Sequence, residues 1–409
     1  MKRCLFVLLV LAFVPVTALA AEPSTNPSNP SVVDRSTLDG KVMCGYQGWF
    51  NCEGDGASLG WTHWARNGNQ TFGPGNVTVD LWPDMTEYDA DERYKTDFKL
   101  ADGSAAEVFS SANKKTVMRH FRWMQDYGID GAFVQRFANG LTSNELREHK
   151  DNVLKYARAG SNEYGRTFAV MYDLSGMKID DDQIVQRDWE KLENQMAITK
   201  DEAYLSHDGK PVVAIWGIGF SDNRPYDLAY CERLIDWFKG KGCTVMLGIP
   251  SYWRDQTRDT IKDPDLHRVL RKADILSPWS VGRYQTPDQA TKHAAEVWAK
   301  DQQWCEAANI DFLPVVFPGF SWHNLKDRPL NEIPRLKGKF LWSQVVGAKK
   351  AGAQMVYVAM FDEVDEATAV FKCTNRPPVG DGVSFIDYEG LPSDFYLKML
   401  GRARDLFND

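Results

Sequence analysis

The chain has 409 residues, of which 43% are hydrophobic and 12% aromatic, and its formal net charge is −8. This length and apolar content can bury a sizeable core, and we expect one large domain because no low-complexity stretch divides the chain. The negative charge argues against a nucleic-acid partner, because phosphate binding needs a positive field. The negative charge does not exclude neutral or cationic ligands.

The N-terminal residues have the pattern of an export signal. Lys2 and Arg3 precede an apolar run that reaches Val14, and an alanine-rich segment follows at 18–21. The pattern predicts a signal peptide over 1–20, a disordered leader rich in Pro and Ser over 21–38, and one folded domain over 39–409. We therefore expect a secreted or periplasmic protein. The apolar run is too short to span a bilayer, so no membrane span is expected.

Beyond the signal segment the chain contains six cysteines, at Cys44, Cys52, Cys231, Cys243, Cys305 and Cys373. An oxidising compartment is compatible with disulfides, and Cys44 with Cys52 and Cys231 with Cys243 would close local loops. Buried free thiols are an equal alternative at each position. The spacing contains no zinc motif.

Short apolar runs rich in Val, Ile, Phe and Tyr recur along the chain, each followed by polar or Gly/Pro residues and a helical pattern. The runs are 41–46, 131–137, 168–173, 211–216, 244–249, 275–280, 312–317 and 355–361. Continuous hydrophobicity is what strands covered on both faces require. Eight strand-helix repeats without a GxGxxG turn predict an α/β fold, a closed (β/α)8 TIM barrel with a long insertion between the first two strands.

Local signals mark where the helices begin and end. The segments 142–145 and 286–289 each fit a capping box, the second with proline at the first helical position. Gly128, Gly160 and Gly240 are predicted to end helices.

The residues that follow the predicted strands are the candidates for a functional site, because barrel enzymes build their sites at the C-terminal ends of the strands. Rings of Trp and Tyr among carboxylates suit a sugar, whose apolar face packs on an aromatic ring while its hydroxyls need polar partners. Core packing is an equal alternative for any single aromatic residue. The strand ends supply Tyr46, Gln47, Trp49, Gln135, Arg136, Tyr172, Asp173, Trp216, Tyr252, Trp253, Trp279, Arg283, Trp322, His323, Glu363 and Glu366.

An acidic cluster, Asp362-Glu363-Val364-Asp365-Glu366, follows the eighth predicted strand. Glycoside cleavage needs one protonated and one ionised carboxyl, and repulsion within the cluster would raise at least one pKa. Glu363 and Glu366 would share a face if the chain turned helically there. An exposed acidic helix start and a Ca²⁺ or Mg²⁺ site are alternatives, although EF-hand spacing is absent. No predicted strand runs directly into a GxSxG nucleophile elbow, and the chain has no HExxH motif.

Several of these segments resemble the endo-acting α-mannosidases and mannanases of glycoside hydrolase family 99 and their α-1,3-glucanase relatives in family 71. Residues 46–50 and 61–64 are similar to the aromatic first-strand loop and the His-Trp segment of that family, and 117–131 and 312–320 to the regions of its second and seventh strands. Residues 361–368 match the shape of its Phe-Asn-Glu-Trp-His-Glu-Gly-Thr motif.

The resemblance implies a retaining mechanism with two catalytic glutamates. Glu363 would assist the sugar 2-hydroxyl to displace the leaving group, giving an anhydro sugar, and Glu366 would be the acid/base. The motif departs from the family at Val364-Asp365 and at Asp362, so mannose specificity does not carry over. On a sugar without a free axial 2-hydroxyl, Glu363 would act as an ordinary nucleophile.

The sequence therefore predicts an exported, monomeric glycoside hydrolase without metal or cofactor, acting inside a polysaccharide or large glycan. A non-catalytic glycan-binding barrel and a metal-dependent enzyme that uses the same acidic cluster are the alternatives. Substrate contacts are expected from Tyr46, Trp49, His63, Trp64, Arg136, Asp173, Tyr252, Trp322, Asp362 and Asp365.

Overall fold

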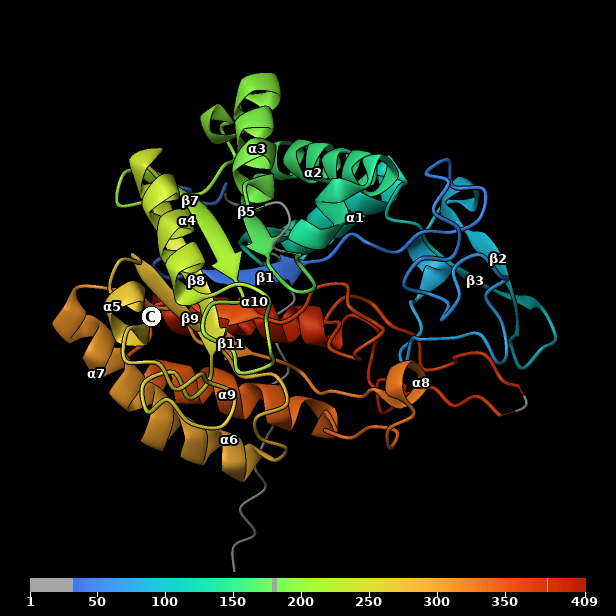
Figure 1. Cartoon of the computed structure of the whole chain (residues 1–409). Helices are drawn as coiled ribbons and strands as arrows, with labels where there is room; N and C mark the ends of the chain where they lie inside the picture. Colours follow the sequence, from blue (N-terminus) through green and yellow to red (C-terminus); the bar gives the residue numbers. More distant parts are fainter. Residues whose placement is uncertain (1–31, 179–181, 381) are drawn as a thin grey trace, which may run out of the picture.

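The computed structural model describes residues 32–178, 182–380 and 382–409 (Figure 1). The predicted signal peptide and most of the predicted leader lie outside these residues. Val33 and Leu38 are buried, and the Val33 amide donates to Gly165 O at 2.9 Å, so the packed chain begins before residue 39. No helix in the described part is long and apolar enough to cross a membrane.

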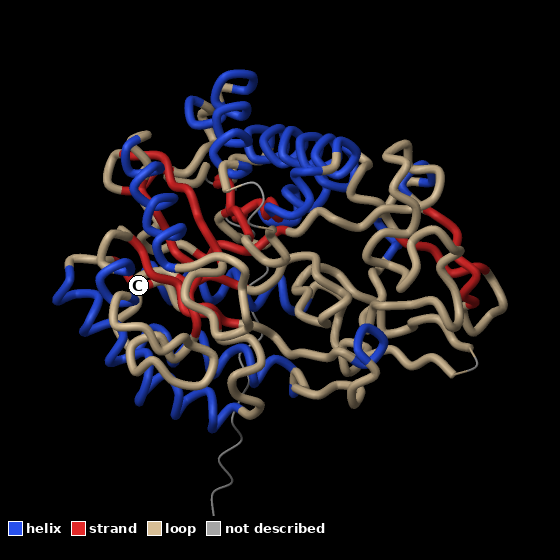
Figure 2. Tube along the Cα trace, in the orientation of Figure 1, coloured by secondary structure: helices blue, strands red, loops and turns tan. Residues whose placement is uncertain are grey.

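Parallel strands form one sheet that closes on itself (Figures 1 and 2). The sheet order is β10-β9-β8-β7-β5-β4-β1-β12-β11, and only Leu313 and Pro314 separate β10 from β11. These two short strands are the halves of the seventh predicted strand, so the sequence prediction of a (β/α)8 barrel is confirmed. The strands are β1 (Val42–Tyr46), β4 (Gly131–Phe137), β5 (Thr167–Asp173), β7 (Lys210–Trp216), β8 (Thr244–Pro250), β9 (Ile275–Trp279), β10 (Asp311–Phe312), β11 (Val315–Val316) and β12 (Val356–Val358), with β6 (Ser206–His207) antiparallel to β7.

Helices surround the barrel, as the repeat requires (Figure 2). Thr286 caps α6 by accepting from the Gln289 amide at 3.2 Å, as predicted, whereas α2 is capped by Ser143, one residue later than predicted. The helices are α1 (Lys114–Asp126), α2 (Asn144–Glu163), α3 (Ile184–Lys191), α4 (Leu228–Gly240), α5 (Leu266–Leu270), α6 (Pro287–His293), α7 (Ala299–Ala308), α8 (His323–Lys326), α9 (Lys339–Lys350) and α10 (Phe395–Asn408).

The glycines predicted to end helices have different roles. Gly128 follows α1 with a φ of +74°, a left-handed conformation that suits glycine after a helix, and Gly240 is the last residue of α4. The prediction for Gly160 is wrong, because α2 continues to Glu163. A Cβ atom at Gly160 would lie 2.8 Å from the Cβ of Phe121, so this glycine allows α1 and α2 to pack closely.

The insertion between the first two barrel strands, residues 51–113, forms its own small unit at the right of Figure 1. It contains the antiparallel pair β2 (Tyr94–Lys99) and β3 (Ala105–Val108) and an aromatic core around Trp64 and Phe72. The amides of Asp80 and Leu81 donate to the carbonyl of Val364 at 3.0 and 3.3 Å. The insertion is therefore bonded directly to the acidic cluster.

All six cysteines in the described residues are buried free thiols. The local disulfides considered for Cys44 with Cys52 and for Cys231 with Cys243 are absent. Cys52 instead donates to the carbonyl of Phe109 at 3.2 Å, inside the insertion. The free-thiol alternative is the correct one.

Candidate active site

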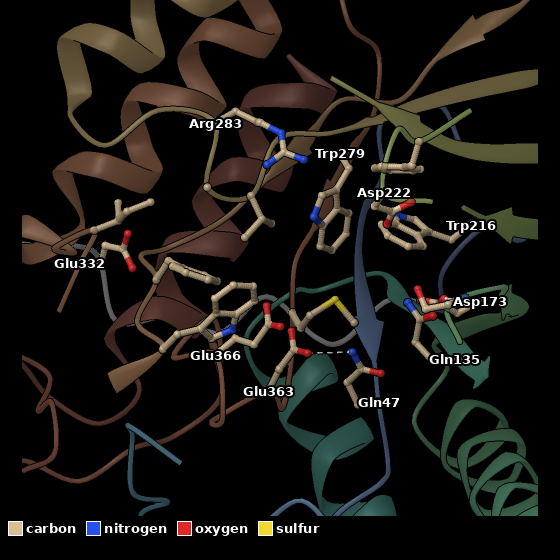
Figure 3. Close-up of a pocket in the computed structure, with 18 of the residues that line it drawn as sticks. Gln47, Gln135, Asp173, Trp216, Asp222, Trp279, Arg283, Glu332, Glu363 and Glu366 are labelled. Carbon is tan, nitrogen blue, oxygen red and sulfur yellow. Dashed lines mark hydrogen bonds between the residues drawn. The ribbon is translucent and has the colours of Figure 1, made fainter. Parts of the chain in front are cut away.

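A cavity of about 600 Å³ opens where the barrel strands end (Figure 3). Its wall combines indole rings with carboxyl, amide and guanidinium groups, as a sugar site requires. Among the residues that line it are Gln47, Trp49, Gln135, Asp173, Trp216, Asp222, Trp279, Arg283, Phe320, Trp322, Arg328, Glu332, Glu363 and Glu366.

Strand register decides which side chains face this cavity, because successive side chains of a strand point to opposite faces. Gln135 pairs with Met171, and Asp173 pairs with Trp216, so these residues share the inner face. Gly248 pairs with Trp216 on the next strand, and a Cβ atom at Gly248 would lie 2.2 Å from Cδ1 of Trp216. The indole of Trp216 therefore packs directly on the backbone of residue 248, where any side chain would clash with it.

Two predicted substrate contacts, Tyr46 and Arg136, face away from the cavity. Tyr46 pairs with Val134 on the outer face, and its hydroxyl bonds Nδ1 of His120 at 2.9 Å. Arg136 is fully buried and donates to Asp188 Oδ2 at 2.8 Å. Both predictions are corrected, since each side chain ties its strand to the surrounding helices.

Two further predicted contacts do not line the cavity. Trp64 is fully buried in the insertion, with its ring 4.5 Å from that of Phe50. The hydroxyl of Tyr252 accepts from Arg258 at 2.6 Å, and the guanidinium lies over its ring at 4.3 Å. Trp64 is a core residue and Tyr252 a loop residue held by an arginine, so neither is placed to contact a ligand in the cavity.

Asp362 holds the loop after β1 in place by hydrogen bonds. Its two carboxylate oxygens accept the amides of Gln47 and Gly48, each at 2.8 Å, and burial raises its pKa to about 7. The Gln47 side chain in turn donates to Oε1 of Glu363 at 3.0 Å (Figure 3). Asp362 thus fixes the loop that orients Glu363 and does not itself line the cavity.

Asp365 acts on the cavity wall through His63. Its Oδ2 pairs with Nδ1 of His63 at 3.1 Å, and the imidazole stacks on Trp49 with ring centroids 3.8 Å apart. Trp49 and Trp322 line the cavity, whereas His63 and Asp365 stand behind that wall. Asp365 thus holds the imidazole of His63, and the imidazole stacks on Trp49 and fixes this part of the wall.

Glu363 and Glu366 both line the cavity and lie near each other in Figure 3. The chain makes a turn there, with the Ala367 amide 3.4 Å from Val364 O, and not the helix assumed from the sequence. Glu363 is 4% exposed and also accepts from Thr368 Oγ1 at 2.9 Å.

The environment of the two glutamates favours their protonated forms. Burial, followed by the charge of Glu366, raises the pKa of Glu363 well above its ordinary value. Burial, followed by the charge of Asp365, raises the pKa of Glu366 to about 7. At neutral pH the pair therefore holds a proton, as a site for general acid catalysis needs.

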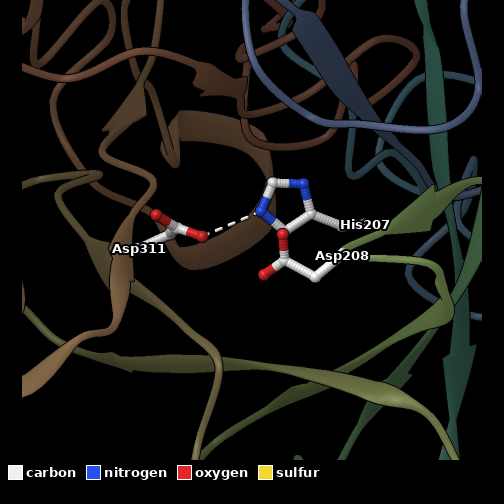
Figure 4. A group of neighbouring side chains, drawn as sticks. All are labelled: His207, Asp208 and Asp311. Carbon is white, nitrogen blue, oxygen red and sulfur yellow. Dashed lines mark hydrogen bonds and ion pairs between the residues drawn. The ribbon is translucent and has the colours of Figure 1, made fainter.

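Two groups with the composition of a metal site lie elsewhere in the described residues. Asp89, Asp91 and Glu92, in the insertion, are already paired with Lys115 and Arg119. The other group lies at the turn that joins β6 to β7 (Figure 4). It consists of His207, Asp208 and Asp311. Nδ1 of His207 accepts the Leu38 amide at 3.0 Å, and Nε2 donates to Asp311 at 2.8 Å. Both ring nitrogens are thus in use, and a neutral imidazole has no second lone pair for an ion. The group is a structural clamp on the start of the domain.

Sequence reasoning missed part of the cavity. Four lining residues were predicted only as strand-end residues, because no sequence pattern shows which side chains face the cavity and which face the helices. These are Gln135, Trp216, Trp279 and Arg283. Loop residues beyond the strand ends carried no periodic signal at all. These are Phe220, Asp222, Phe320, Arg328 and Glu332.

No protein-family model and no curated protein matches the chain. Among solved structures, it is similar to the GH99 endo-α-mannosidase from Bacteroides thetaiotaomicron, with 16% identity over 91% of this chain and 98% of that chain and a TM-score of 0.65. A structure of a Bacteroides GH99 endo-α-mannosidase in complex with bis-tris-propane gives 17% identity, the same coverage and a TM-score of 0.62. A glycoside hydrolase-like protein gives 14% identity over 83% of this chain and 98% of that chain, with a TM-score of 0.52. The likeness to family 99 expected from the sequence is confirmed for the fold.

Proposed function

We propose that the chain is a secreted or periplasmic glycoside hydrolase of the family 71/99 type, which cleaves within a polysaccharide or large glycan and retains the anomeric configuration. One observation carries the proposal: Glu363 and Glu366, both with raised pKa values, line the same aromatic cavity at the C-terminal end of the barrel. The fold shared with a protein described as an endo-α-mannosidase supports it.

The roles of the two glutamates are assigned from the resemblance of residues 361–368 to the family 99 motif, because the pKa values of both carboxyls are raised and do not decide which one holds the proton. Gln47 and Thr368 donate to the two oxygens of Glu363 and hold it in place. In this assignment Glu366 protonates the leaving oxygen and later activates water. Glu363 accepts the proton of the sugar 2-hydroxyl as that oxygen attacks the anomeric carbon. Where no such hydroxyl is available, its carboxylate attacks directly, and both routes retain configuration.

Single Gln substitutions test the assignment. In E363Q and E366Q we expect release of reducing ends from a polysaccharide panel to fall by about 10²–10⁴-fold, because each variant keeps its shape but loses the proton transfer. E306Q, on the exposed face of α7, makes the same change away from the cavity and should hydrolyse as the parent does.

Other outcomes separate the alternatives. Undiminished hydrolysis in both glutamine variants would contradict the assignment. A parent protein that binds a glycan without cleaving it would support a glycan-binding barrel, and loss of hydrolysis on adding a chelator would support a metal-dependent enzyme. NMR of the first-formed product reports whether configuration is retained.

A further inference from the structure

The cavity contains carboxyl groups that form no ion pair with a cation in the described part of the protein. Its two arginines are already paired: Arg283 donates to Asp259 at 2.6 Å and Arg328 to Glu332 at 3.3 Å. Asp222, at the rim, pairs with Arg224 at 2.8 Å. No ion pair within the described residues involves the other three acids of the cavity, Asp173, Glu363 and Glu366.

Asp173 is the one of these three that the proposed chemistry does not use. It ends β5 and is 8% exposed, and its Oδ1 accepts the Ser175 amide at 2.7 Å. Burial raises its pKa to about 6, so most of the carboxyl is ionised at neutral pH. The charges of Arg224 and Lys150 favour the ionised form of Asp173, but neither forms an ion pair with it. A direct cationic partner is therefore left for a ligand to supply.

Gln135 presents a second acceptor beside Asp173. The residue pairs with Met171, two positions before Asp173, so both side chains lie on the inner face of neighbouring strands. Its Nε2 donates to the hydroxyl of Tyr357 at 3.0 Å, which leaves Oε1 pointing away from that partner. Gln135 is 6% exposed, and its Oε1 is buried without a hydrogen-bond partner. Figure 3 shows Gln135 and Asp173 together at one side of the cavity, near Trp216.

We propose that Asp173 and Gln135 form a subsite for a protonated amine, so that the substrate carries an amino sugar with a free ammonium group. An ammonium has three donors and no acceptor, which complements a carboxylate and an amide oxygen. Its charge balances Asp173, whereas a neutral hydroxyl or an N-acetyl group would leave that charge unpaired. A bare metal ion would need more oxygen ligands than these two groups supply. The indole of Trp216 offers a face for the sugar ring.

This inference rests on the proposed function only for the presence of a saccharide, and binding alone tests it. Glucosamine, galactosamine and mannosamine are titrated at pH 7 against their N-acetyl counterparts by calorimetry or ligand-observed NMR. We expect at least one amine to bind the parent about tenfold tighter than its N-acetyl form, as a charge-assisted bond in a dry site would give. D173N should abolish the preference, and an unchanged circular dichroism spectrum and melting temperature would show that the variant is folded.

A matched control is D208N, which removes the same charge at the exposed turn of Figure 4 and should keep the preference. Equal binding of amines and N-acetyl sugars by the parent, no amine binding at all, or a preference that survives in D173N would each overturn the subsite. Hydrolysis assays of E363Q and E366Q fail or succeed independently of these titrations. A failed hydrolase assignment is thereby distinguished from a failed amine subsite.

Discussion

Tyr46 and Tyr88 both bond the ring of His120, from the Nδ1 and Nε2 sides and each at 2.9 Å. Burial lowers the pKa of His120 to about 3, so the ring is neutral and has one donor and one acceptor. One tyrosine therefore donates and the other accepts. The aromatic residue at the end of β1 thus stabilises the contact between barrel and insertion and does not reach the cavity.

Y46F tests this structural role. The variant leaves one imidazole nitrogen buried without a partner, so we expect the free energy of unfolding to fall by about 1–3 kcal/mol. Hydrolysis by the folded protein should keep its kcat/KM. Urea unfolding and steady-state kinetics on the same preparation measure the two effects. A large loss of kcat/KM at unchanged stability would return Tyr46 to the list of substrate contacts.

Asp365 connects the charge of the acidic cluster to the pH dependence of the proposed reaction. Its carboxylate raises the pKa of both Glu363 and Glu366. In D365N this repulsion is lost, so Glu366 should give up its proton at lower pH, and the alkaline limb of the kcat/KM profile should move to lower pH. An acid catalyst must be protonated, which fixes the direction. A profile that stays in place or moves to higher pH would argue against Glu366 as the acid.

The barrel strands were predictable because hydrophobic runs of this length, repeated eight times between helices, have few other interpretations. The inner face of each strand was not predictable. A strand buried on both sides is apolar or buried-polar throughout, so the sequence does not distinguish Gln135, which faces the cavity, from Arg136, which binds Asp188 and Asp151 behind it. Only the register of neighbouring strands decides between them.

Gly248 gives a test of how strand packing positions the cavity wall. In G248A the new methyl group would meet the Trp216 indole, so we expect that ring to move, with KM raised about tenfold. Stability should fall by about 1–3 kcal/mol from overpacking. G240A is the matched control, because a Cβ atom at Gly240 would meet no atom within 4 Å. An unchanged KM in G248A would remove Trp216 from the substrate-binding wall.

For the whole molecule, the six free thiols indicate that the fold is stabilised by its buried core and not by disulfide bonds. A domain of this size buries enough apolar surface to fold without cross-links, and an even cysteine count does not show which solution the chain uses. We expect reducing agent to leave the melting temperature unchanged. Alkylation in denaturant without reductant should label all six cysteines from Cys44 to Cys373. Protection of any pair from alkylation would show that a disulfide forms.

Residues 51–113 are hydrogen-bonded to the acidic cluster, and this affects which mutations the protein can tolerate during evolution. The bonds from Asp80 and Leu81 to Val364 use backbone amides, so their formation does not depend on which side chains occupy those positions. Mutations can accumulate across the insertion, and with them new surfaces around the mouth of the barrel, while the peptide that carries the two glutamates keeps its place. Divergence of the surface around the barrel mouth and preservation of the positions of Glu363 and Glu366 are thus separable in this fold.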